Sequence, residues 1–253
     1  MEMERSIFLD IPDVNEVIGS KTKIVYPGKA DVDAKDDARN HQSWILGRGA
    51  LALMKQLNKT PDFIVMSETS SMFAHPTLFR DKFSDDPLFA RSKTVFNDHT
   101  PLEYAHPKWS HEKARQLKVD PRYYDKIPVW VGGGVLDVTA LVINASDMVF
   151  GVARKHGAVM RAMDGLKQFV DKIKSITNGV SRRFWQNSLL VNMEKVTEMT
   201  DDEILAIKDK ERVELIRWFA KRQKLGDDWA DRMIAGGNPV GIWTRRVVEY
   251  KRL

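Results

Sequence analysis

Alternating apolar and polar positions predict strands in the first part of the chain, with one helix between them. Short alternating runs cover residues 6–9 and 22–26, and the run FIVM covers 63–66. Residues 42–57 instead space their apolar side chains at helical intervals, although Gly47 and Gly49 interrupt the pattern. We expect this helix to end before Pro61, because the residue before a proline is pushed out of the helical region.

The next sixty residues, 67–126, contain five prolines and little periodicity. One short helix is predicted at 110–117, with Ser110 as its N-cap. Long segments with so little regular pattern often cover a functional site. We therefore expect an insertion or lid, and a simple surface insertion explains the pattern equally well.

The second half of the chain alternates between strand and helix patterns. Strands are predicted at 128–131, 135–143, 183–192 and 242–250, and helices at 153–174, 201–224 and 227–234. Thr200 and Glu203 have the spacing of a capping box. The elements do not follow a regular βαβ order, which predicts an α+β fold. We expect one domain over 1–253, with a C-terminal helical appendage and final strand at 200–253.

Composition excludes several kinds of chemistry. The 253 residues include no cysteine, so disulfides, thiolate metal sites and cysteine nucleophiles are impossible. The sequence has no apolar run of the ~20 residues that a membrane span needs. We expect a cytoplasmic protein that does not bind membranes.

The formal net charge of +5 is concentrated in one segment. Residues 151–183 carry eight basic and two acidic side chains. Such a cluster favours a nucleotide or nucleic acid as partner, and a solvated helix face is the alternative. Within it, Arg182 and Arg183 adjoin Phe184 and Trp185, which suits either a phosphate-and-base contact or an ordinary surface.

Other candidate sites fit simpler structural roles. Four histidines at 75, 99, 106 and 111 could bind zinc with Asp98 or Glu112, but their spacing fits exposed loop residues better, and we expect no metal site. The glycines at 132–134 precede no helix with a Lys-Ser/Thr pair and favour a hairpin turn. Asp147 follows a strongly apolar run, where it either caps a turn or holds a substrate.

Four stretches in order resemble the thymidylate synthase and deoxycytidylate hydroxymethylase family. The best is LDVTALVINASDMVFG, in which Asp147 and Gly151 have the family's spacing; the others are LMKQLNKTPDFIVMSE, IPVWV and WQNSLLVN. The resemblance implies a mixed sheet packed with helices, a pyrimidine nucleotide pocket, a homodimer and folate as a conceivable cofactor.

The departures from that family are substantial. The catalytic cysteine is missing, Asn144 and Ala145 replace the phosphate-binding Arg and its neighbouring Ser, and Lys155 stands in the position that reads the base. Cysteine-based one-carbon transfer therefore cannot occur.

From these features we predict a protein that binds a pyrimidine nucleotide, in phage or viral nucleotide or DNA-base modification. The alternative is a non-enzymatic nucleic-acid-binding or assembly protein that uses the basic segment. The candidate acid/base residues are Asp147, His156 and Glu68. The candidate substrate-binding residues are Asn144, Ser146, Gly151, Arg154, Lys155, Arg182, Arg183 and Trp185.

Overall fold

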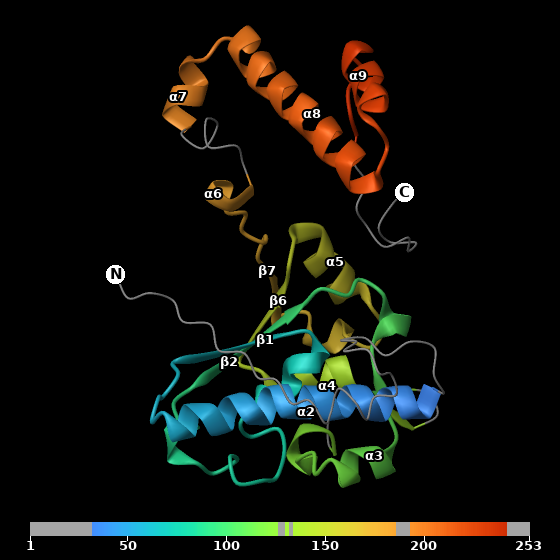
Figure 1. The fold of residues 1–253 in the computed structure, drawn as a ribbon. Coiled ribbons are helices and arrows are strands. Elements are labelled where there is room, and N and C mark those ends of the chain that lie inside the picture. Colours follow the sequence, from blue (N-terminus) through green and yellow to red (C-terminus); the bar gives the residue numbers. More distant parts are fainter. Residues whose placement is uncertain (1–31, 126–129, 132–133, 186–192, 242–253) are drawn as a thin grey trace. The chain divides into compact units, whose positions relative to one another are not determined.

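The computed structural model describes residues 32–125, 130–131, 134–185 and 193–241 (Figure 1). The chain divides into two compact units, residues 1–178 and 179–253. The predicted strands at 6–9, 22–26 and 242–250 lie outside the described residues.

The first unit is built on a four-stranded parallel sheet. Its order is β1 (Phe63–Ser67), β2 (Lys93–Asp98), β6 (Met148–Gly151) and β7 (Ile173–Ser175). Phe96 is in register with Val149, and Gly151 with Ser175. Because all neighbouring strands are parallel, their ends gather at two opposite edges. We call these the carboxyl edge and the amino edge.

Helix α4 (Val138–Ala145) lies at the centre of the core of this unit. Its residues from Val138 to Ile143 are all buried, together with Met66 and Phe96 of the sheet. Asp137 starts the helix, since its Oδ1 accepts a hydrogen bond from the backbone N–H of Ala140.

Helix α2 (Val32–Gln56) packs against the 3-10 helix η1 (Thr69–Ala74). A Cβ at Gly47 would lie 2.2 Å from the backbone carbon of Phe73, so this close approach requires glycine. Arg48 is buried in the same contact and pairs with Asp81 at 2.8 Å.

A small antiparallel sheet and several short helices complete the unit. The sheet has the order β3 (Lys108–Trp109), β5 (Val135–Asp137) and β4 (Trp130–Val131). Ser110 caps α3 as predicted, because its Oγ accepts from the N–H of Lys113. The helices are α3 (His111–Gln116), α5 (Arg154–Ala162), η2 (Pro87–Phe89), η3 (Glu103–Ala105), η4 (Pro121–Tyr123) and η5 (Lys167–Phe169).

The second unit contains helices in its described part. These are α6 (Arg182–Trp185), α7 (Met193–Glu198), α8 (Asp201–Gln223) and α9 (Asp227–Ala235). The predicted capping box is confirmed at Thr200 and Glu203, and α8 ends at Lys224 in a left-handed conformation with φ 57°.

Three predicted elements are wrong. The strand at 135–143 stops at Asp137, and the remainder is the buried helix α4. The helix at 153–174 ends at Ala162, because Met163 is extended and the N–H of Gly165 donates to Glu103. The strand at 183–192 begins as α6, and its last seven residues lie outside the described part.

The prediction of a mixed α and β protein is confirmed, but regular structure extends into 67–126. This segment contains β2, an inner strand of the parallel sheet. Among the described residues, no helix is both long enough and apolar enough to cross a membrane.

Candidate functional site

Three ionisable side chains meet at the carboxyl edge of the parallel sheet. Glu68 follows β1, Asp98 ends β2, and His156 lies in the first turn of α5. The Nε2 atom of His156 is 3.0 Å from Oδ2 of Asp98, and both side chains are buried. Ligands of open parallel sheets typically bind outside this edge.

Glu68 has an unusual backbone at this edge. Its φ of 64° and ψ of 164° lie in a region that residues with a Cβ rarely adopt, at a cost of about 1–3 kcal/mol. The carboxylate accepts hydrogen bonds from the N–H of His99 at 3.0 Å and from Oγ1 of Thr100 at 3.1 and 3.2 Å. These hydrogen bonds hold the Glu68 carboxylate in place near Asp98 and maintain the strained backbone.

The electrostatic surroundings favour proton exchange by Glu68. Burial raises the pKa of Glu68, and the nearby charge of Asp98 raises it further. The hydrogen bonds from Thr100 and His99 oppose this rise only in part. A carboxyl group with a raised pKa next to an Asp-His pair is typical of acid/base sites.

The N-terminus of α5 lies at the same edge. Its first turn carries the exposed cations Arg154 and Lys155, has no acidic residue, and has no side-chain cap at Ala153. A Cβ at Gly151 would lie 2.7 Å from the backbone nitrogen of Gly157, so the strand end touches the helix. Helix N-termini with free N–H groups attract anions.

Asp147 lies at the opposite, amino edge, where it joins two strands. Its carboxylate accepts from the backbone N–H and the hydroxyl of Thr94, both at 2.8 Å, and from Nζ of Lys93 at 3.3 Å. Burial alone would raise the pKa of Asp147, but these hydrogen bonds outweigh it and lower the pKa. Asp147 is therefore a structural link between β2 and β6, separated from Arg154 and Lys155 by the length of β6.

Two further candidates have structural partners beside α4. Nδ2 of Asn144 donates to the carbonyl oxygen of Tyr123, and the carbonyl oxygen of Asn144 accepts from Nζ of Lys172. Ser146 is buried and its hydroxyl donates to the carbonyl oxygen of Val142. Both residues thus fix the C-terminal end of the helix.

The remaining candidates lie in the second unit. Trp185 is 75% exposed and meets the ring of Phe184 edge-on at 4.9 Å between centroids. The backbone of Arg182 and Arg183 belongs to α6, and their side chains lie outside the described part.

Several cations of the basic segment 151–183 are engaged within the protein and are not free to bind an anion. Arg161 donates to the carbonyl oxygen of Ile173, Lys167 pairs with Asp164, and Lys172 is half-buried.

Two of the four histidines expected in exposed loops are buried instead. Nε2 of His75 donates to the carbonyl oxygen of Ala145 at 3.1 Å, and His106 lies 4.0 Å from Oδ2 of Asp137. Within the described ranges, no three His, Asp or Glu side chains are grouped as a metal site.

Glu68 and His156 were named from the sequence as acid/base candidates, but Asp98, whose carboxylate contacts His156 and lies near Glu68, was not. Asp98 entered only as a conceivable zinc ligand. Thr94, Val95 and Phe96 ahead of it are β-branched or aromatic and were a usable signal for a strand that ends near Asp98.

Comparison with known proteins gives similarity to solved structures alone. No protein-family model matches the chain, and no curated protein matches it. Among solved structures, it is similar to the catalytic domain of starch synthase IV from Arabidopsis thaliana bound to ADP and acarbose. The match has a TM-score of 0.49 and 19% identity, and covers 62% of this chain and 32% of that chain. At this level the similarity establishes neither a shared fold nor a shared activity.

The resemblance to thymidylate synthase is wrong. Residues 138–145, which the resemblance requires in a strand, form helix α4, and no thymidylate synthase family model or curated protein matches the chain. The folate cofactor and the homodimer were implied only by that resemblance and lose their basis with it.

Proposed function

We propose that the chain binds a nucleotide at the carboxyl edge and takes part in nucleotide-dependent group transfer. The observation that carries this proposal is the meeting of Glu68, Asp98 and His156 beside the uncapped N-terminus of α5. A pyrimidine base and a purine base are both compatible with it.

The phosphate groups of the nucleotide would bind at the start of α5. Ala153 at the N-cap gives its first N–H groups no side-chain cap, and Arg154 and Lys155 add positive charge where the helix dipole is also positive. This arrangement destabilises the helix end until an anion binds, which supports a phosphate ligand over a neutral one.

Proton transfer would be supplied by the Asp98–His156 pair and by Glu68, which lies near the charge of Asp98. Asp98 orients the ring of His156 through its 3.0 Å contact with Nε2, while burial and the nearby Asp98 raise the pKa of Glu68 above that of an ordinary carboxyl group. An acceptor hydroxyl bound here would lose its proton to His156 or Glu68 as its oxygen bonds to the transferred group. The bond between that group and the phosphate would break at the same time, and the nucleotide would leave with the electron pair, its charge held at the start of α5. No thiol is required.

Isothermal titration with ADP and with dTMP at low salt tests nucleotide binding. We expect R154A/K155A to weaken binding by about tenfold, because two charges next to the phosphates are lost. The control K208A/K210A removes two exposed charges from α8 and should leave affinity unchanged. Absence of binding by both nucleotides, or equal loss in the two variants, would contradict the proposal.

The nucleic-acid alternative has less support. Three of the basic residues in the 151–183 segment have partners within the protein or are half-buried, as described for Arg161, Lys167 and Lys172. A polynucleotide surface needs several cations that remain available to phosphates. Binding of single-stranded nucleic acid that weakens steeply with added salt would favour this alternative.

A further inference from the structure

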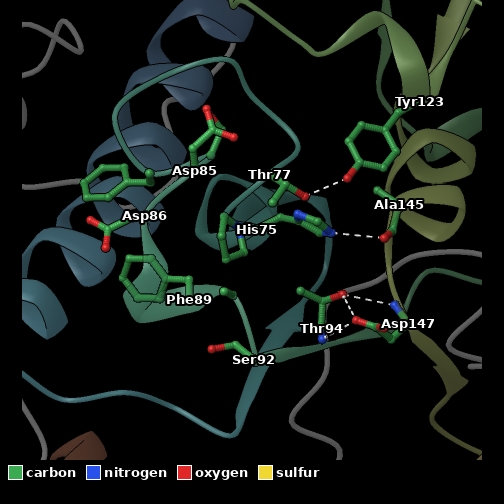
Figure 2. Close-up of a pocket in the computed structure, with 14 residues that line it drawn as sticks. His75, Thr77, Asp85, Asp86, Phe89, Ser92, Thr94, Tyr123, Ala145 and Asp147 are labelled. Atoms are coloured by element: carbon green, nitrogen blue, oxygen red, sulfur yellow. Dashed lines mark hydrogen bonds between the residues drawn. The ribbon is translucent and has the colours of Figure 1, made fainter.

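A second concave site lies at the amino edge, at the other ends of β2 and β6. The hollow has a volume of about 320 Å³, which is within the range of small-molecule pockets. Its lining comes from the segment after η1, from η2, from the start of β2 and from the end of α4 (Figure 2). It is separate from the carboxyl edge, where we place the nucleotide.

The charged groups in this lining are all acidic. Asp85, Asp86 and Asp147 belong to it, and none of its 14 residues is Lys or Arg. Asp86 and Asp147 already pair with the exposed Lys55 and Lys93. Asp85 is exposed, and no partner of its carboxylate is found in the described part of the chain. One negative charge of the hollow is therefore uncompensated.

Three hydroxyl groups of the lining have already donated their protons. Ser84 donates to the carbonyl oxygen of Asp81, Ser92 to that of Pro61, and Thr94 to the carboxylate of Asp147. The hydroxyl oxygens of Ser84 and Ser92 keep only lone pairs for a ligand, whereas that of Thr94 also accepts from the N–H of Asp147. The hydroxyls of Thr77 and Tyr123 bond to each other at 2.6 Å, which leaves one of their protons as a donor. With its carboxylates, the hollow therefore presents more acceptors than donors.

His75 adds a buried acceptor to the same lining. It is 3% exposed, and burial lowers its pKa to about 4, so the ring is neutral at physiological pH. Its Nε2 contacts the carbonyl oxygen of Ala145 and must carry the proton, which leaves Nδ1 as an acceptor. In the described residues this Nδ1 atom has no hydrogen-bond donor. Figure 2 shows His75 amid the lining residues Thr77, Phe89 and Thr94.

We propose that this hollow binds a small organic cation with N–H donors, an alkylammonium compound with an apolar body. The ammonium group would pair with Asp85 and satisfy neighbouring acceptors, and the body would lie against Phe89. A bare metal ion fits poorly, because the described carboxylates and histidines do not converge on one point and the space is many times the ~30 Å³ of a water molecule.

Titration with phenethylammonium, and with 2-phenylethanol as its neutral counterpart, tests the proposal. We expect the ammonium compound to bind at millimolar concentration and the alcohol at least about tenfold more weakly, because the alcohol lacks the charge. D85N should weaken the binding of the ammonium compound by about tenfold. Since Asp85 is exposed, this change should leave the fold intact.

Two controls distinguish binding in this hollow from nonspecific charge attraction and from binding at the carboxyl edge. D228N removes an exposed carboxylate from α9 and should not change the affinity. ADP at saturating concentration should not displace the ammonium compound, because the two sites are at opposite edges. Equal binding of the alcohol, no effect of D85N, or displacement by ADP would each overturn the inference.

Discussion

The two edges of the parallel sheet shift the pKa of a carboxyl group in opposite directions. Asp147 at the amino edge receives three hydrogen bonds, and its pKa falls despite partial burial. Glu68 at the carboxyl edge is half-buried near a second carboxylate, and its pKa rises. A carboxylate with a lowered pKa stabilises the fold, whereas one with a raised pKa costs stability and is suited to proton transfer. The comparison indicates that Asp147 secures the structure at the amino edge, whereas the carboxyl edge has the electrostatics that the proposed chemistry needs.

The largest expected effect is acid destabilisation through His75 at the amino edge. Burial, opposed by the Ala145 hydrogen bond, lowers the pKa of His75 from 6.5 to about 4 in the folded chain. Between these values the unfolded chain binds more protons, so stability falls as pH falls from 6.5 to about 4. The total loss is on the order of 3 kcal/mol.

Urea unfolding at pH 7 and pH 4.5 measures this loss. H75Q should reduce the difference between the two pH values, because glutamine cannot be protonated. H99Q, which changes an exposed histidine, should retain it. An unchanged pH dependence in H75Q would show that His75 does not titrate as described.

A smaller effect is expected for D147A at the amino edge. The change leaves the buried N–H and hydroxyl of Thr94 without their acceptor, and we expect a loss of about 2 kcal/mol in the free energy of unfolding. Nucleotide affinity should not change. A loss of nucleotide binding in the folded variant would place Asp147 in the functional site after all.

The smallest change in the free energy of unfolding is expected for E68Q, and this change should be a stabilisation. The folded chain raises the pKa of Glu68, so the ionised form opposes folding at neutral pH and its protonated form favours folding below 4.5. A neutral glutamine removes this cost and should stabilise the fold by less than about 1 kcal/mol after solvent screening. Group-transfer activity should be lost.

Thermal and urea unfolding of E68Q are compared with those of E214Q, which changes an exposed glutamate on α8. The second variant should match the parent in stability. Destabilisation of E68Q would indicate that Glu68 serves the fold rather than chemistry.

Local signals in the sequence predicted much of the structure correctly. The apolar run at β1, the Ser110 cap and the Thr200 capping box depend on neighbouring residues, and all three are confirmed. The apolar run at α4 gave a wrong strand prediction. A helix that is buried on every side has no polar face, so its sequence lacks the helical spacing of apolar and polar residues. Periodicity alone cannot distinguish such a helix from a buried strand.

The candidate site was predictable only in part, since its contacts are non-local. Glu68 and His156 were named singly as candidates, but Asp98, the partner of His156, is 58 residues from it along the chain. The pairing of β2 with β6 brings Asp98 next to Gly151 and the start of α5. Asp147 and Arg154, only seven positions apart, end at opposite edges because a strand lies between them.

The most direct test of the account follows the side-chain resonances of the histidines by NMR during titration with ADP. His156 reports on the carboxyl edge and His75 on the amino edge, and H156Q and H75Q assign the two signals. We predict that ADP shifts the His156 signal and leaves the His75 signal in place. A shift of His75 with no change at His156 would contradict the assignment of function to the carboxyl edge.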